Sequence, residues 1–209
     1  MSNTEKQKNI YITIVAFLAI LIPTPGRFVY GFTVIFEMAL LMVLGTLLDE
    51  LIKKLKLTHL KTVLLMMIIL FISVFYRQII VILHPEVALV LGFVLYLPPI
   101  SLFLMGFLYR NNDLPLKNRL LKNSILILTV IIFGLIFFLI RDILGYGTFT
   151  FFGNCHQIYE KVIITSDKLG IFSFLASIPG SLMLLGLFLY LYIFVSQKIN
   201  IIKNAEVQK

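Results

Sequence analysis

Long apolar runs constrain this chain more than any other feature of its sequence. Six segments approach or reach the length of about 20 apolar residues that a helix needs to cross a bilayer. They are residues 10–26, 28–48, 62–83, 87–108, 124–140 and 169–195. The sequence therefore predicts an all-α, polytopic membrane protein with six transmembrane helices in a single membrane domain, residues 1–209.

Composition excludes the soluble alternative. Of the 209 residues, 60% are hydrophobic and 13% are charged, whereas a soluble domain averages about 45–50% apolar and about 25% charged residues. A water-soluble fold would have to expose too much apolar surface. The first run resembles a signal peptide but has no small-residue cleavage site, so we expect it to be retained as the first helix.

The distribution of basic residues predicts an orientation. Under a six-helix arrangement, 13 Lys and Arg lie on the side that holds both tails, and 5 lie on the other side. Because positively charged loops stay in the cytoplasm, both termini are predicted to be cytoplasmic. The net charge of +8 is therefore interpreted as orientation charge, and we expect no nucleic-acid partner.

Two of the predicted helices contain proline breaks. Pro23 and Pro25 interrupt the end of the first helix, and Pro98 and Pro99 interrupt the fourth. A proline frees backbone carbonyls, and in a membrane these must be satisfied by a neighbour, a cavity or an ion. Each break is either a packing kink or part of a binding site at the midplane of the membrane.

The breaks fall at matching positions in two halves of the chain, residues 1–83 and 84–209. The segment at 48–52, which ends the second helix, similarly echoes 140–144, which ends the fifth. With three helices in each half, the second half enters the membrane from the opposite side. The sequence thus predicts an inverted repeat, an arrangement in which paired broken helices point to a midplane site.

Three segments resemble the six-helix membrane subunits of the Rnf complex and the sodium-translocating NADH:quinone reductase, most closely the RnfE/NqrD type and, more broadly, the RnfA/NqrE type. They are residues 84–93 (HPEVALVLGF) with the following Leu97 and Pro98, residues 140–149 (IRDILGYGTF) with Phe152 and Gly153, and residues 178–180 (IPG) with 184–187 (LLGL). The order and spacing of the three match the family, while the first half of the chain fits by pattern only.

This resemblance implies a subunit of a bacterial inner-membrane complex that couples electron transfer to ion movement, with a sister six-helix subunit among its partners. In the family, cysteines of the first and fourth helices hold an iron centre at the midplane. Here these positions fall near Ile22 and within 102–105, which contain no cysteine. The family iron or 2Fe-2S site is therefore predicted to be absent. The single cysteine, Cys155, lies in the fifth loop and is no substitute; no role is assigned to it.

Glu37 is the one acidic residue deep inside an apolar run. A carboxyl group in that position is costly in lipid and marks either an ion path or a paired structural group. It shares a helix face with Thr33 and Leu41, one turn away on either side. The two interpretations are a group that binds a proton or contacts sodium, and a neutral carboxyl group held by a neighbouring helix.

Arg141 and Asp142 end the fifth helix where the resemblance is strongest. The arginine is expected to bind a lipid headgroup or a partner's carboxylate, or to pair locally. Asp49 and Glu50, each four residues before a lysine, are interpreted as a solvated helix end with weak ion pairs.

Three hypotheses for function follow. The first is an Rnf/Nqr-type membrane subunit, a scaffold or ion-path component without an iron centre. The second is a stand-alone small transporter or carrier component that reuses the inverted-repeat fold. The third is an assembly or anchoring protein that transports nothing.

Overall fold

The computed structural model describes residues 17, 19–101, 115–153, 157–165 and 170–207, and these are mostly helical. Within these described residues, four helices are long and apolar enough to cross a membrane. They are α2 (Phe28–Lys54), α3 (Lys61–Leu83), α7 (Leu116–Ile140) with its π-helical continuation η3 (Arg141–Tyr146), and α9 (Ile178–Val207). A helical membrane fold is confirmed by these elements.

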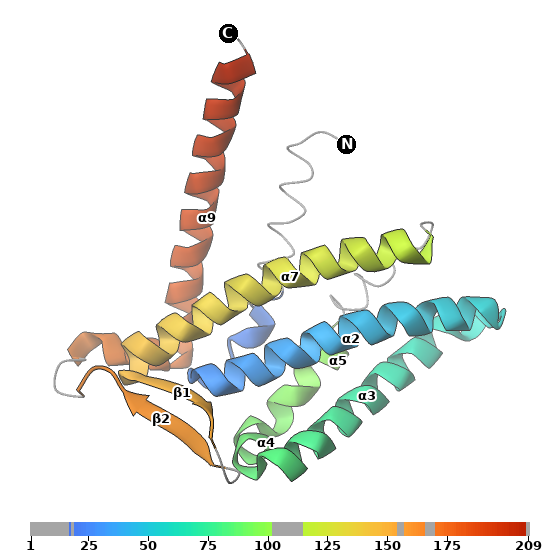
Figure 1. The fold of residues 1–209 in the computed structure, drawn as a ribbon, viewed down its shortest axis with the longest axis horizontal. Helices are drawn as coiled ribbons and strands as arrows, with labels where there is room; N and C mark the ends of the chain where they lie inside the picture. Colours follow the sequence, from blue (N-terminus) through green and yellow to red (C-terminus); the bar gives the residue numbers. More distant parts are fainter. Residues whose placement is uncertain (1–16, 18, 102–114, 154–156, 166–169, 208–209) are drawn as a thin grey trace.

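Helices α2 and α7 form the centre of the structure and run antiparallel (Figure 1). Their close approach depends on small residues. A Cβ atom at Gly134 would lie 2.7 Å from Cδ1 of Ile35, and one at Gly31 would overlap the ring of Phe138. Helix α3 packs on the other side of α2, and a short 3₁₀ turn, η1 (Thr58–Leu60), connects the two. Residues of α2 and α7 therefore make up the larger part of the core.

The predicted fourth helix is divided into three short pieces. They are α4 (Pro85–Leu91), the 3₁₀ segment η2 (Gly92–Tyr96) and α5 (Leu97–Ile100). The chain already turns at Gly92, whose φ of +41° is readily adopted by glycine. Pro98 and Pro99 then fall in the first turn of α5, where a missing N–H is tolerated. The remainder of this predicted helix, residues 102–108, lies outside the described residues.

The first predicted helix is described only at residues 17 and 19–26; its earlier part lies outside the described residues. Pro23 and Pro25 lie in the turn that leads into α2, with the backbone N–H of Thr24 donating to Leu21 O (3.1 Å). This turn ends the short helical stretch around Phe17 and Leu21, whose side chains are buried in the core. The break at this position is therefore a connection to α2.

The fifth loop forms an antiparallel hairpin, which the sequence analysis did not predict. Strand β1 (Thr148–Phe152) pairs with β2 (Ile158–Val162), with Thr148 opposite Val162. Alternation along β1 directs Thr148 and Thr150 inward, while the rings of Phe149 and Phe151 contact that of Phe28 with centroid distances of 5.3 and 6.2 Å. The hairpin thereby covers the start of α2 within a mostly helical fold.

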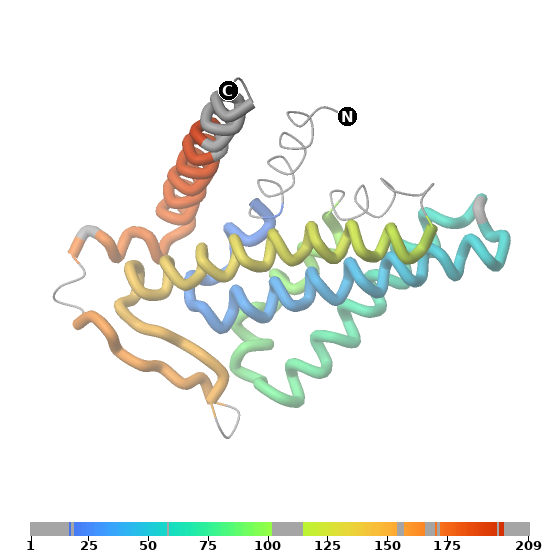
Figure 2. Tube along the Cα trace, turned by 45° about the horizontal axis from the view of Figure 1, so that its top comes forward, coloured from blue at the N-terminus to red at the C-terminus, as the bar shows by residue number. Residues whose placement is uncertain are grey.

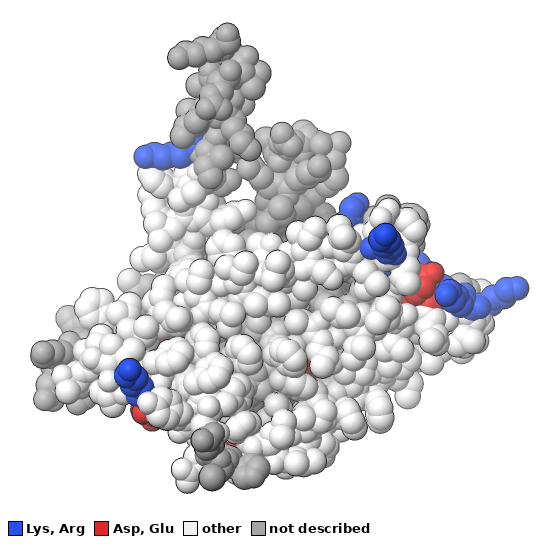
Figure 3. Space-filling view, in the orientation of Figure 1, with Lys and Arg blue, Asp and Glu red and all other residues white. Residues whose placement is uncertain are grey.

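Helix α9 follows a 3₁₀ segment, η4 (Gly170–Ala176), and projects away from the other helices (Figures 1 and 2). In the most apolar 18-residue stretch of α9, only 22% is buried inside the protein, and the corresponding share for α3 is 28%. Large side chains such as Phe71 of α3 and Met183 of α9 are exposed. Figure 3 shows charged side chains at the ends of the helices, with a largely uncharged surface between them on this face. Such surfaces indicate a membrane-embedded protein.

Candidate functional site

Glu37 lies in the middle of α2 and its side chain is completely buried. Thr33 and Leu41, on the same helix face, are buried as well. This face of α2 packs against α3 and against the broken segment formed by η2 and α5. The acidic residue singled out by the sequence thus lies beside one of the two proline breaks.

The proline pair leaves one carbonyl group of the broken segment without a helical partner. In a helix, Leu95 O would accept a hydrogen bond from the N–H group three or four residues later. Those residues are Pro98 and Pro99, and proline has no N–H. The neighbouring Val94 O avoids this problem because it accepts from Leu97 N–H. Leu95 O must therefore find its donor outside the backbone of its own helix.

Ser73 of α3 provides that donor. Its Oγ lies 3.1 Å from Leu95 O and also forms a short hydrogen bond with Oε1 of Glu37. One hydroxyl group therefore connects the buried carboxyl group of α2 to the carbonyl freed by the prolines. We call the group formed by Glu37, Ser73 and the Leu95 carbonyl the carboxyl–serine site.

A second hydrogen bond joins α3 to α2 one helical turn away from Ser73. The hydroxyl of Tyr76, one turn after Ser73, donates to Thr33 O at 2.9 Å, and the hydroxyl of Thr33 donates to Val29 O at 2.8 Å. The carbonyl of Thr33 and the hydrogen of its hydroxyl are thus each engaged in a hydrogen bond. Oε2 of Glu37, by contrast, is buried and has no hydrogen-bond partner among the described residues. The carboxyl–serine site therefore offers few oxygen atoms, and the carboxyl group dominates its chemistry.

Asp142, at the end of α7, is a structural acceptor. Its Oδ2 accepts hydrogen bonds from the N–H of Phe28 (3.1 Å) and from the N–H and hydroxyl of Thr150 (both 2.7 Å), while Oδ1 accepts from the hydroxyl of Thr148 (3.0 Å). Residue Arg27, the N-cap of α2, has no side-chain cap bond. Asp142 thus caps α2 from another helix, where its charge also complements the helix dipole.

Arg141 points to a different set of partners, and the described residues contain no ion pair between it and Asp142. Its Nη1 donates to Thr24 O (3.0 Å) and its Nη2 to Ala176 O (3.2 Å). The guanidinium carbon lies 5.7 Å from the ring centres of both Phe137 and Phe138. The side chain is 1% exposed. Arg141 therefore joins the turn before α2 to the segment before α9.

The end of α2 differs from the solvated end that the sequence analysis predicted. The carboxylate of Asp49 is fully buried, and lies 2.7 Å from Nη1 of Arg119 and 2.6 Å from Nζ of Lys61. Arg119 also donates to Thr46 O at 2.8 Å. The predicted i,i+4 pair is present, with Lys53 Nζ 3.8 Å from the Asp49 carboxylate. The prediction of a solvated end was wrong because residues of α3 and α7, two of them cations, bury this carboxylate. Spacing along one helix gives no information about these partners.

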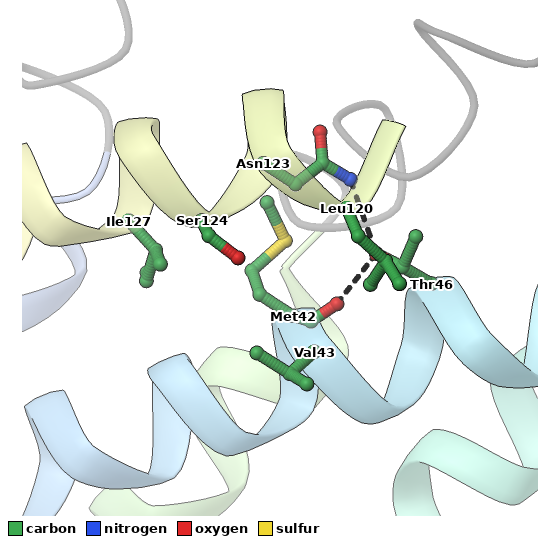
Figure 4. Close-up of a pocket in the computed structure, with 7 residues that line it drawn as sticks. All are labelled: Met42, Val43, Thr46, Leu120, Asn123, Ser124 and Ile127. Atoms are coloured by element: carbon green, nitrogen blue, oxygen red, sulfur yellow. Dashed lines mark hydrogen bonds between the residues drawn. The ribbon is translucent and has the colours of Figure 1, made fainter. Parts of the chain in front are cut away.

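Figure 4 shows the α2–α7 contact beside this ion cluster. The amide of Asn123 donates to Oγ1 of Thr46 (3.0 Å), whose hydroxyl donates to Met42 O (2.7 Å). The space between the surrounding side chains is too narrow to admit a water molecule. This contact is therefore helix packing and leaves no room for a ligand.

A larger, open pocket of about 370 Å³ lies beside the start of α4. Arg27 and Glu160 line it and form a two-pronged ion pair, with distances of 3.0 and 3.5 Å. Tyr30 and Glu86 also contribute to its wall. Because both members of the ion pair are partly exposed, the pair contributes little to stability.

The structure describes one of the two positions at which the resemblance would place iron ligands. Ile22, at the first-helix position, is an aliphatic residue packed against the core and offers no metal ligand. The fourth-helix position, 102–105, and Cys155 lie outside the described residues. Within the described ranges, no group of three or more His, Cys, Asp or Glu residues is arranged to hold a metal ion.

Sequence reasoning identified Glu37, Arg141, Asp142 and the prolines, but it did not identify Ser73. A serine inside an apolar run gives no signal by itself, although a search for donors facing the proline-freed carbonyl would have drawn attention to it. Comparison of the chain with models of protein families and with curated proteins finds no match.

Proposed function

We propose that this chain is a membrane subunit of an ion-translocating electron-transport complex of the Rnf/Nqr type. In this role it is a scaffold or ion-path component and holds no iron centre of its own. The proposal rests on the three motifs of the second half, whose order and spacing match the family. It is supported by the positions of Arg141 and Asp142, which organise the junction where the strongest motif lies.

The observation that carries the ion-path role is the burial of Glu37 against the break at Pro98 and Pro99. A buried carboxyl group in a spanning helix marks an ion or proton path by default. Broken helices supply the backbone carbonyls that such paths use. Here the two features meet through Ser73, at the carboxyl–serine site.

The proposal includes six spans arranged as an inverted repeat. Asp49 ends α2 and Asp142 lies at the end of α7, and each carboxylate contacts the beginning of the other helix. A carboxylate that fixes each opposed end supports this arrangement, with a guanidinium partner for Asp49 and backbone and hydroxyl donors for Asp142. We further propose that the protein resides in a bacterial inner membrane with both termini in the cytoplasm, beside a sister six-helix subunit.

Native purification tests this proposal. The chain, tagged and extracted from its own membrane in a mild detergent, should bring with it subunits that carry flavin and iron–sulfur clusters. Mass spectrometry identifies these proteins, and absorption spectra identify their cofactors. A homogeneous monomer or homodimer without redox partners would contradict the complex and favour the stand-alone transporter.

The ion-path role has its own test. Glu37→Gln should abolish sodium- or proton-coupled activity of the complex in sealed vesicles while leaving the complex assembled. Glu86→Gln provides a matched control, because Glu86 is exposed at the start of α4. Unchanged coupling in Glu37→Gln would exclude Glu37 from the path.

A further inference from the structure

We propose that Glu37 binds a proton, and that Ser73 links this protonation to the hydrogen bonding of the proline-broken helix. The inference rests on the proposed ion-path role of Glu37 and names its ion. It derives from the number of hydrogens that the carboxyl–serine site requires, and from the burial of its members.

The hydroxyl of Ser73 has fewer hydrogens than it has hydrogen-bond contacts. Ser73 has a single hydroxyl hydrogen, yet its Oγ is in hydrogen-bond contact with two oxygen atoms, Oε1 of Glu37 and Leu95 O. Leu95 O is a carbonyl and can only accept. Both contacts are two-centre hydrogen bonds, each with a hydrogen of its own, only if Glu37 supplies the second hydrogen. A protonated Glu37 donates to Ser73, and Ser73 then donates to Leu95 O.

The other carboxyl oxygen supports the same assignment. Oε2 of Glu37 is buried without a partner among the described residues. A carboxylate would place half of a negative charge on this atom in an apolar environment, and an unpaired buried charge is costly. In a neutral acid, Oε2 is a weakly accepting carbonyl oxygen. The protonated form therefore fits both oxygen atoms.

A metal cation fits this site less well. Hard cations such as Mg²⁺ and Ca²⁺ take about six or more oxygen ligands. The described part of the site offers the Glu37 carboxyl group, the Ser73 hydroxyl and the Leu95 carbonyl. The nearby Thr33 has its carbonyl and hydroxyl engaged elsewhere.

Other titratable groups on the packed elements leave the assignment unchanged. Helix α3 contributes Tyr76, whose hydroxyl is bound to Thr33 O, and Arg77, which forms no ion pair with Glu37 in the described part of the chain. Segment η2 contributes Tyr96, and α5 has no titratable residue. No cation is therefore present among the described contacts to stabilise a carboxylate at position 37.

Deprotonation would change the broken helix. When the proton leaves Oε1 for the aqueous phase, Glu37 becomes an acceptor and competes with Leu95 O for the one hydrogen of Ser73. Since a charged acceptor forms the stronger bond, Ser73 turns towards Glu37. Leu95 O then loses its donor, and Pro98 and Pro99 cannot replace it. Release of the proton from Glu37 is therefore expected to rearrange η2, the segment between α4 and α5.

Infrared spectroscopy of the purified full-length chain in lipid vesicles tests this inference. The wild type at neutral pH should show the carbonyl stretch of a protonated carboxylic acid. Glu37→Gln should remove this band, and Glu86→Gln should leave it in place. Ser73→Ala should shift the band, because the acid loses its hydrogen-bond acceptor; this second variant keeps the test valid if Glu37→Gln does not accumulate.

Two results would overturn the inference. One is a set of identical acid bands in the wild type and Glu37→Gln, which would mean that Glu37 is ionised. The other is loss of the Glu37 band on addition of NaCl at constant pH, which would identify a sodium site. Neither depends on redox partners, so failure of this inference is distinguishable from failure of the complex to copurify.

Discussion

Asp49 and Arg119 form an ion pair in which both side chains are fully buried, with 2.7 Å between Oδ2 and Nη1. The pair joins the end of α2 to the beginning of α7. At the other end of the same helices, Asp142 binds the first N–H of α2. The central antiparallel pair is thus fixed at both ends by a carboxylate, in one case with a guanidinium partner and in the other with backbone and hydroxyl donors.

Removal of one partner of the buried pair should be strongly destabilising. Asp49→Asn removes the closest carboxylate from Arg119, whose other carboxylate, Glu50, lies 4.0 Å away. Breaking a buried pair costs about 3–5 kcal/mol. The thermal unfolding midpoint in detergent, followed by circular dichroism, measures the effect. Lys53→Ala is the control, because Lys53 lies 3.8 Å from Asp49 and is partly exposed; it should change stability by about 0–1 kcal/mol. A double variant, Asp49→Asn with Arg119→Gln, should be more stable than the sum of the single effects predicts.

Replacement of Asp142 by Asn should loosen the start of α2. The amide has one acceptor oxygen for a site with four donated hydrogen bonds, and hydrogen bonds to charged groups contribute about 1.5–3 kcal/mol each. We expect a lower unfolding midpoint and faster amide exchange at Phe28 and Thr150. Thr129→Val, which removes only a bond to Ile125 O of the same helix, serves as the comparison. Equal midpoints for the two variants would show that Asp142 is not a cap.

A methyl group at Gly31 should separate α2 from α7. The added Cβ would overlap the ring of Phe138, and overpacking of this kind typically costs about 1–3 kcal/mol. At Gly186 of α9 nothing lies within 4 Å of the same added atom, so Gly186→Ala should be close to neutral. Unfolding of the two alanine variants in the same detergent tests the contact. If Gly31→Ala proves as stable as Gly186→Ala, the close approach of the helices is wrong.

Cysteine accessibility tests which surfaces lie in lipid. In a Cys155→Ser background, Phe71→Cys on α3 should resist a membrane-impermeant maleimide in intact vesicles and react after solubilisation. Leu55→Cys, at the basic end of α2, should react from one side of the membrane in intact vesicles. Both side chains are exposed in the structure, at 69% and 59%, so burial in the protein does not explain a difference. Rapid labelling of Phe71→Cys in sealed vesicles would argue against a membrane position for α3.

Apolar run length predicted the long helices well, because hydrophobicity and helix length are local properties of a sequence. The division of the fourth run was predicted only at its prolines; the earlier turn at Gly92 depends on how α4 packs against α3. The hairpin at Thr148 was missed because its pattern of Thr and Phe is short and sits in what reads as a loop.

In the candidate site, too, the sequence predicted local features but not the contacts between distant segments. Glu37 was identifiable because a carboxyl group is conspicuous in an apolar run. Its partner Ser73 lies 36 residues away and was not identifiable, because no local pattern indicates which helix faces it. The burial of Asp49 was missed for this reason as well, since its cations come from α3 and α7.

The hydrogen bond between Phe28 and Asp142 spans 114 residues of sequence, and this has a consequence for biosynthesis. The start of α2 leaves the ribosome long before its cap has been translated. Until α7 and β1 have been synthesised, the first N–H groups of α2 need other hydrogen-bond acceptors, such as water or lipid headgroups at the membrane surface. Insertion of α2 and its final seating are therefore separate events in time. A chain truncated after residue 83 would contain α2 and α3 but lack the cap that completes them.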